Sequence, residues 1–189
     1  SMVTIMMGWY STVALAAYQI VLTFVTLTFQ VACGIASATT ILVSHAFGRR
    51  DKTEVSCYSM SGLHLSFLSM GISALCFIFF GRQITSLFST DIDVIRQGAM
   101  LFVVAGAFQL FDGAQSTLLG ALRGINDVTK PMKYSFLSYI LFAIPMAYCL
   151  GFLFGFGPCG ILSGEALGLM LAALLYYRRL RKSTSAMKL

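Results

Sequence analysis

Asp112 is the residue whose type and position most strongly indicate chemistry. It lies near the middle of residues 97–121, an apolar segment with no other charged side chain. An ionised aspartate at the centre of a membrane helix costs about 2.5–3.5 kcal/mol on insertion scales, and such residues usually face a cavity and function. Phe108, Gln109 and Gln115 share its helical face. The pattern favours a carboxyl that exchanges a proton for a cation; the alternative is a structural hydrogen bond or ion pair.

A polar stripe runs along the long apolar segment near the N-terminus. Its members recur at steps of three, four or seven residues, which places them on one helical face. We expect this face to line a water-accessible cavity, against the alternative of hydrogen bonding between helices, worth about 0.6 kcal/mol per bond. The stripe comprises Gln19, Thr23, Thr26, Gln30, Cys33, Ser37 and Ser44.

Other reactive residue types show weaker patterns. Glu165 is the second acidic residue inside an apolar segment, but it follows Gly160 by little more than one helical turn. Its side chain can reach water there, so a structural or interfacial role is favoured. His45 and His64 lack metal-binding spacing, and the five cysteines lack paired spacing. We find no convergent nucleophile set and predict no enzyme, no cofactor and no metal beyond a possible Na⁺ at Asp112.

The composition indicates the surroundings of these residues. The 189-residue chain is 58% hydrophobic and only 11% charged, with a mean hydropathy of +0.83. Soluble domains carry about 25% charged residues, so a water-exposed globule and a disordered chain are both excluded. The net charge of +6 comes from short basic clusters between apolar runs, which is typical of membrane proteins rather than nucleic-acid binders. The fold class predicted is an all-α polytopic transmembrane bundle.

The charges and helix-breaking residues divide one membrane domain, 1–189, into five full spans and a truncated first one. No charge precedes Arg49, and a helix of 48 residues would be about 70 Å long, so we expect a break at residues 8–12. A second break is expected at residues 155–160. The predicted spans are 1–8 (partial), 14–48, 55–80, 97–121, 134–154 and 161–177, and a basic tail follows at 178–189.

Lys and Arg alternate between richer and poorer connections. In chain order the connections hold none, three, two, three, none and five. Because cytoplasmic loops carry an excess of basic residues, residues 49–54, residues 122–133 and the C-terminus are expected in the cytoplasm. The pattern predicts an integral protein of the plasma membrane. In a bacterium this would be the inner membrane.

A short motif, G-x-x-D, occurs at two expected cytoplasmic span ends, at Gly48–Asp51 and Gly124–Asp127. A glycine can end one helix and an aspartate can cap the next. We interpret both copies as structural, together with Arg123.

Several of these segments resemble the multidrug and toxic compound extrusion (MATE) family. They read L-A-A-Y-Q-I at residues 15–20, G-I-A-S-A at 34–38 and G-x-x-D at 48–51. The most specific part is F-Q-L-F-D-G-A-Q at residues 108–115, followed by G-A-L-R-G-I-N-D at 120–127, which is similar to the tenth helix of NorM-type members. The resemblance covers essentially the whole chain.

The resemblance implies one lobe of a twelve-helix transporter, running from the end of helix seven to helix twelve. Such transporters export organic cations and other drugs by antiport with H⁺ or Na⁺, which implies lipid, drug-like molecules and the N-terminal lobe or a second copy of this chain as partners. Asp112 matches the proposed ion-coupling carboxylate. The implied substrate-cavity residues are Gln19, Thr23, Thr26, Gln30, Phe108, Phe111 and Gln115.

The chain departs from the family pattern at three places. Phe108 replaces a tyrosine, which removes one oxygen ligand for Na⁺, Leu162 replaces a tryptophan, and residues 30–34 lack a common proline. Two alternatives remain open at this point. One is a flippase of lipid-linked precursors with related architecture, although no basic residue lies deep in a span. The other is a non-transporting membrane scaffold or fragment.

Overall fold

The computed structural model describes residues 2–186, and helices make up nearly all of this range, without a strand. One rod, from Thr129 to Leu153, joins α-helical and π-helical pieces. In chain order the elements are α1 (Met2–Tyr10), α2 (Thr12–Gly48), α3 (Lys52–Phe88), α4 (Ile92–Gly124), α5 (Thr129–Phe136), η1 (Leu137–Ala143), α6 (Ile144–Tyr148), η2 (Cys149–Leu153) and α7 (Gly157–Ala186).

Five of these segments are long and apolar enough to cross a membrane: α2, α3, α4, the rod and α7. The nine-residue α1 precedes them, where the partial first span was predicted. The prediction of an all-α bundle with five full spans is confirmed. Large apolar side chains such as Leu27, Leu68 and Phe79 are exposed on the outside, as expected of a surface that meets lipid.

Local capping explains where the helices begin. Ser11 has an extended backbone and its hydroxyl accepts a hydrogen bond from the Ala14 N–H at 3.0 Å, which starts α2 at the predicted break. At the other break, Gly155 and Gly157 adopt positive φ angles of 72° and 60°, which glycine tolerates without strain. The chain turns there between η2 and α7.

The helices extend beyond the predicted spans, so the connections are shorter than expected. The connection expected at 81–96 shrinks to residues 89–91, because α3 continues to Phe88 and Asp91 caps α4 by accepting from the Asp93 N–H at 2.9 Å. Helix α7 continues through Ala186, into the segment predicted as a basic tail. Residue 1 of the predicted first span and residues 187–189 of the tail lie outside the described residues.

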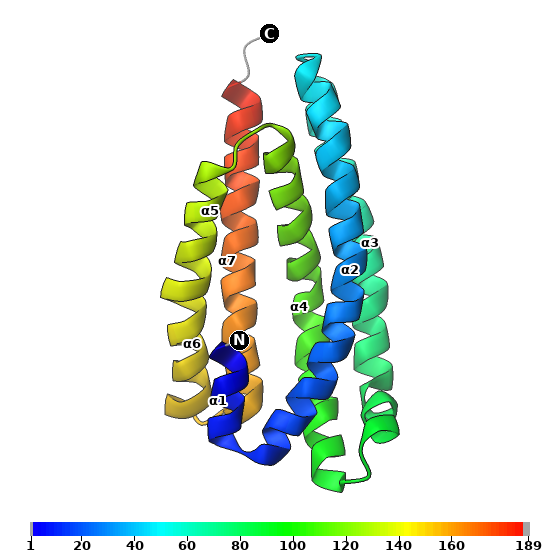
Figure 1. The fold of residues 1–189 in the computed structure, drawn as a ribbon, viewed down its shortest axis with the longest axis vertical. Helices are drawn as coiled ribbons and strands as arrows, with labels where there is room; N and C mark the ends of the chain where they lie inside the picture. The colour runs from blue at the N-terminus through cyan, green and yellow to red at the C-terminus, as the bar shows by residue number, and fades with distance from the viewer. Residues whose placement is uncertain (1, 187–189) are drawn as a thin grey trace.

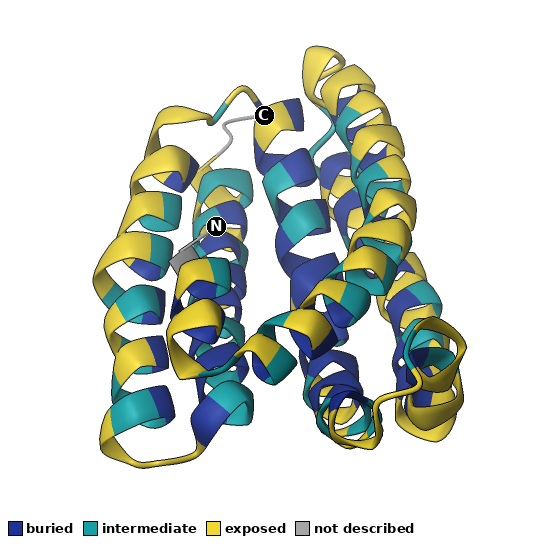
Figure 2. Cartoon of the chain, turned by 60° about the horizontal axis from the view of Figure 1, so that its bottom comes forward, coloured by how far each residue is buried: buried dark blue, intermediate teal, exposed yellow. Residues whose placement is uncertain are grey.

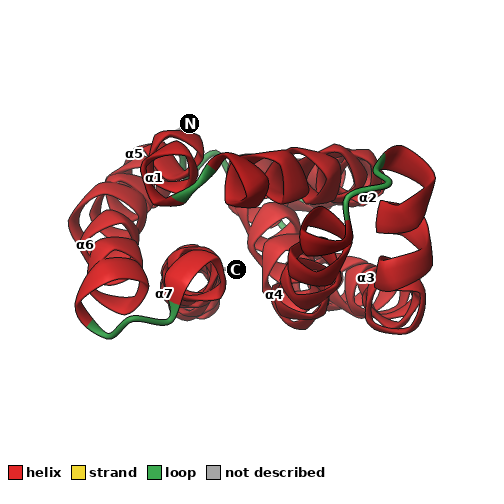
Figure 3. Ribbon diagram, turned by 90° about the horizontal axis from the view of Figure 1, so that it is seen from below, coloured by secondary structure: helices red, strands yellow, loops and turns green. Residues whose placement is uncertain are grey.

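Helix α4 lies at the centre of the bundle and packs against α2, α3 and α7 (Figures 1 and 3). The rod and α1 pack on the other side of α7. Buried residues line the sides of the helices that face one another, and exposed residues line the outer sides (Figure 2). The contact of α4 with α2 is close: a Cβ on Gly120 would lie 2.5 Å from the Ala36 carbonyl oxygen. Thr40 adds a 2.9 Å hydrogen bond from its hydroxyl to the Gly120 carbonyl.

Candidate functional site

A cleft of about 250 Å³ opens beside Asp112, where α2, α4, η1 and α7 meet. Its polar groups come from four elements: Thr26 on α2, Asp112 on α4, Tyr139 on η1 and Glu165 on α7. Aromatic and aliphatic side chains complete the wall, namely Tyr18, Val21, Leu22, Val25, Phe29, Phe108, Leu162 and Leu169. The cleft therefore combines two carboxyl groups with aromatic faces, a combination that suits cations.

Asp112 is buried, with 8% of its surface exposed. Among the residues that the structure describes, none donates a hydrogen bond to its carboxyl group and none forms an ion pair with it. Buried carboxyl groups are normally paired or hydrogen-bonded, because removing a charge from water without compensation is costly. A buried carboxyl group that lacks such a partner and borders a cleft is available to a ligand.

A second cleft, of about 330 Å³, lies further along α4 and shares Asp112, Phe29 and Tyr139 with the first. Arg123 also lines it, yet forms no ion pair with Asp112. Gln115 lines this second cleft, where its side-chain oxygen accepts a 2.8 Å hydrogen bond from the Tyr139 hydroxyl. Asp112 and Tyr139 therefore border both openings.

The π-helical turns of η1 carry Tyr139 into the site. A π turn rotates the following side chains relative to a regular α-helix, and such turns are frequent at functional sites. Pro145 follows η1 closely and has no N–H to continue the regular hydrogen-bond ladder. Tyr139, held by Gln115, was not singled out in the sequence, because π turns leave no periodic signal there.

The polar stripe of α2 divides between the clefts and the outer surface. Thr26 lines the first cleft, and Cys33 and Ser37 line the second. Gln19, Thr23 and Gln30 are exposed and line neither cleft, so this chain does not gather the whole stripe around Asp112. The reason is geometric: at about 100° per residue the stripe is about 80° wide, with Thr26 and Cys33 toward one edge and Thr23 and Gln30 toward the other.

The two aromatic residues expected beside Asp112 lie on different sides of α4. Phe108 is buried in the first cleft. Phe111 lines a separate apolar groove between α3, α4 and α7. The prediction that it lines the Asp112 cavity is therefore wrong. Adjacent residues on a helix are about 100° apart, whereas residues four apart are about 40° apart.

Glu165 also lies elsewhere than the sequence interpretation expected. It was expected at an interface near the end of its helix, whereas the structure places it half-buried in the cleft that holds Asp112. The two carboxyl groups interact electrostatically. The signal was present, since Glu165 is an acid inside an apolar span, and such residues face a cavity or partner by default.

The two G-x-x-D motifs form the same turn. Arg50 and Asn126, the third residues, have φ angles of 59°, and the aspartate N–H that follows bonds back to the carbonyl of Ala46 or Leu122. This is the Schellman pattern of helix ends. Helices α2 and α4 end at the motif glycines, Gly48 and Gly124, as expected, while the left-handed residue is the third of the motif. In Gly124 the missing side chain serves packing instead, since a Cβ would lie 2.8 Å from Val43.

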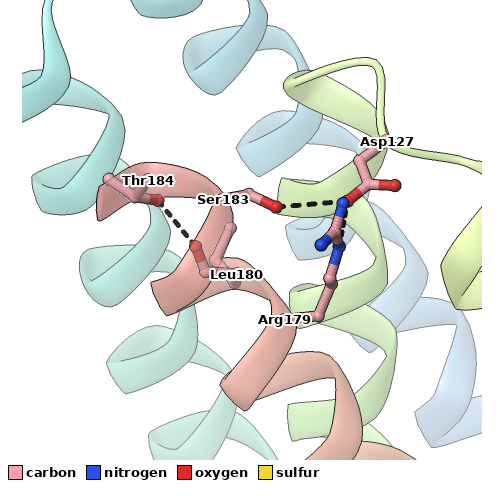
Figure 4. Close-up of polar contacts among 5 residues, drawn as sticks. All are labelled: Asp127, Arg179, Leu180, Ser183 and Thr184. Carbon is pink, nitrogen blue, oxygen red and sulfur yellow. Dashed lines mark hydrogen bonds and ion pairs between the residues drawn. The ribbon is translucent and has the colours of Figure 1, made fainter. Parts of the chain in front are cut away.

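The two aspartates of the motif have different roles. Asp51 caps α3 by accepting a 3.0 Å hydrogen bond from the Glu54 N–H. Asp127 does not cap α5; its carboxylate accepts from the Arg179 Nε at 2.5 Å and from the Ser183 hydroxyl at 3.2 Å (Figure 4). Asp127 thereby ties the end of α4 to α7.

Metal-binding chemistry has little support in the described part of the chain. No group of three or more His, Cys, Asp or Glu side chains gathers there. Asp112 and Glu165 bring two carboxyl groups to one cleft, and Phe108 carries no oxygen toward them. The arrangement can bind a cation through charge, or take up a proton.

The chain matches the MatE family model over residues 1–149. It is 32% identical over 192 aligned residues to a probable multidrug resistance protein NorM of Rhizobium meliloti, with 97% of this chain and 41% of the relative covered. A protein of the same description from Rhodopseudomonas palustris is 36% identical, with 92% of this chain and 38% of the relative covered. The chain thus spans about two fifths of the length of these relatives.

Solved structures share the fold. The chain superposes on a MATE protein in the straight conformation with a TM-score of 0.90 at 17% identity, covering 98% of this chain and 42% of the other. For the outward-facing conformation of a multidrug resistance MATE family transporter the TM-score is 0.88 at 18% identity, covering 98% and 41%. The bundle seen in this chain is therefore also found as part of longer proteins.

Proposed function

Because this chain belongs to the MatE family and is an integral membrane protein, we propose that it forms the C-terminal lobe of a multidrug efflux transporter. The transporter exports organic cations or other drugs and takes up H⁺ or Na⁺ in exchange. The relatives are named as multidrug resistance proteins, and their greater length leaves room for a second lobe. That lobe is either an N-terminal half or a second copy of this chain.

The observation that carries the proposal is the buried carboxyl of Asp112, which borders the cleft and has no ion-pair partner in the described part of the chain. A drug cation would contact this carboxyl and lie against the aromatic faces of Tyr18, Phe29 and Phe108, each contact of this kind contributing about 0.5–2 kcal/mol. Thr26 would add an adaptable polar contact.

Exchange follows from competition for one negative charge. Uptake of H⁺ or Na⁺ at Asp112 would neutralise the charge that attracts the drug cation, so the drug leaves. Loss of the ion on the other side of the membrane would restore the charge and the affinity. Rocking of two lobes about a central site would expose the cleft to each side in turn. Gln19, Thr23 and Gln30, exposed on α2, would then face the other lobe across the central cavity.

The orientation we propose places the C-terminus in the cytoplasm. The supporting observation is that Arg49 follows the end of α2 and Arg123 lies in the last turn of α4, while Arg178 begins the basic final segment of α7. These three helices end at the upper end of the bundle in Figure 1. The excess of basic residues in cytoplasmic connections favours this end as the inner one.

The test is drug export by the assembled transporter carrying Asp112→Asn. We expect export of ethidium from cells, and ion-driven uptake into everted vesicles, to fall to the background of cells without the transporter. Asp93→Asn is the matched control, since it removes an exposed carboxyl from the first turn of the same helix. Normal export by Asp112→Asn at equal membrane abundance would remove Asp112 from the mechanism.

The same vesicles identify the coupling ion and the partner. A proton gradient and a Na⁺ gradient are applied separately. Only the gradient of the coupling ion should drive ethidium uptake. Purified chain that self-associates and exchanges ethidium in vesicles would identify a second copy as the other lobe. A monomer that is inactive until an N-terminal half is added would identify that half.

A further inference from the structure

A groove between α3 and α7 lies at the proposed cytoplasmic end, away from the Asp112 cleft. The two helices lie on different sides of α4 and touch each other little (Figure 3). The space between them holds two clefts that share Tyr177: a polar one of about 560 Å³ near the helix ends, and an apolar one of about 250 Å³ deeper in the bundle. We call the two together the α3–α7 groove.

The polar part of the groove is basic. Lys52 and Arg181 are its charged lining residues, and Ser56, Ser59 and Thr184 also line it. The Ser59 and Thr184 hydroxyls donate to carbonyls of their own helices. Within residues 2–186, no acidic side chain lines it. A cleft with two cations and the hydroxyl of Ser56 as a further donor matches the chemistry of a phosphate ester.

These two cations differ from Arg49 and Arg179 at the same end of the bundle. Arg179 pairs with Asp127, and Arg49 pairs with Glu54. Lys52 and Arg181 form no ion pair with any residue in the described range. The Lys52 Nζ donates a 3.3 Å hydrogen bond to the Ser185 carbonyl, which holds the ammonium group at the groove without neutralising it.

The deeper part of the groove is apolar. Leu63, Phe67, Phe111 and Leu174 are among its lining residues, and Phe67, Phe111 and Leu174 are 38–50% exposed. Along α3 the lining runs from Lys52 to Phe67, a rise of about 22 Å. Half of a bilayer core of about 30 Å, plus the headgroup region, is of similar depth. The groove therefore changes from basic to apolar over the thickness of one leaflet.

We propose that the α3–α7 groove binds one anionic phospholipid of the cytoplasmic leaflet. Its phosphate lies between Lys52 and Arg181, and an acyl chain lies along Phe67, Phe111 and Leu174. Basic pockets between membrane helices on the cytoplasmic side are known to take acidic lipid headgroups. A free phosphate would satisfy the same two cations but would leave the apolar part unfilled. The lipid joins α3 to α7 where they have few direct contacts, independently of any role of Asp112.

The experiment measures lipid binding to the purified full chain in detergent, by native mass spectrometry and by thermal stabilisation. Phosphatidylglycerol should bind and raise the unfolding temperature, whereas phosphatidylcholine should do neither. The double variant Lys52→Gln/Arg181→Gln should weaken phosphatidylglycerol about thirty-fold, from the contribution of two cations at a membrane surface. The control Lys130→Gln/Lys133→Gln removes two exposed charges at the same end of the bundle outside the groove and should bind as the parent does.

Two further arms decide between sources of phosphate and guard against misfolding. Leu174→Ser should weaken phosphatidylglycerol but not inorganic phosphate, because only the lipid uses the apolar part. The charge-conserving Lys52→Arg/Arg181→Lys should retain binding, which separates loss of charge from loss of fold. Equal binding of phosphatidylcholine, equal weakening by the Lys130/Lys133 control, or competition by inorganic phosphate with no effect of Leu174→Ser would each overturn the proposal.

Discussion

Two aspartates on or just after α4 have opposite surroundings. Asp127 follows the end of the helix, where Arg179 and Ser183 both bond its carboxylate. Asp112 lies four turns earlier in the middle of the bundle, more deeply buried, and has no such partner among the described residues. Asp127, the less buried of the two, is thus the one whose charge has partners, although its burial costs less free energy than that of Asp112.

The difference indicates a structural role for Asp127 and a functional role for Asp112. A paired carboxylate stabilises the contact between two helices, and its charge is already used. An unpaired one contributes nothing to packing and persists at a cost, which makes it a candidate for binding a ligand. The comparison therefore predicts opposite consequences for the same Asp→Asn change at the two positions.

The largest stability effect is expected for Asp127→Asn. Removing one partner of a buried pair costs about 3–5 kcal/mol, but Arg179 and Asp127 keep 19% and 15% of their side-chain surface exposed, so we expect about 2–3 kcal/mol. Unfolding in a denaturing detergent, followed by helical circular dichroism, measures this loss. Asp112→Asn in the same assay should not lower stability. A comparable loss at both positions would show that Asp112 has a structural partner after all.

A smaller effect is expected for Glu165→Gln in the assembled transporter. Glu165 shares the cleft with Asp112 but is only half-buried, so it should contribute to holding a cation rather than carry the exchange. We expect the KM for a cationic drug to rise about tenfold, equivalent to about 1.4 kcal/mol, with export still driven by the ion gradient.

Two controls accompany that change. The KM for a neutral drug should stay the same in Glu165→Gln, and the charge-conserving Glu165→Asp should retain the affinity for the cationic drug. Equal losses for cationic and neutral drugs would mean that Glu165 supports the fold of the cleft and does not contact the substrate.

Hydropathy and charge alone predict the bundle, because apolar segments of this length have few alternatives to spanning helices. Asp112 is found the same way, as a lone charge whose cost needs an explanation. The charge of Glu165 indicates that it faces a cavity, but that this cavity is the one beside Asp112 could not be predicted. The Glu165 side chain reaches the cleft only because of how α7 is rotated against α4, and rotation depends on packing between distant segments.

Phe111 and Asp127 show the same limit at shorter and longer range. Phe111 is adjacent to Asp112 in the chain but points about 100° away around the helix, into the α3–α7 groove. The spacing of Asp127 after Gly124 predicts a helix cap, yet Arg179, fifty-two residues later, takes that carboxylate instead. Local pattern identifies which residues are unusual, and tertiary contacts decide what they do.

The smallest effect is expected at a third carboxylate, Glu54, which pairs with Arg49 at the bundle end. Their side chains are 37% and 60% exposed, and exposed pairs contribute little because water and salt screen them. Although the hydrogen bond and charge of Glu54 raise the pKa of Arg49, the guanidinium is charged at every relevant pH in either case. Glu54→Gln should leave unfolding and export unchanged. The nearby Asp51→Ala, which removes the cap of α3, should lower the free energy of unfolding by about 1 kcal/mol. An equal loss from Glu54→Gln would mean that the contribution of these carboxylates to stability does not follow their burial.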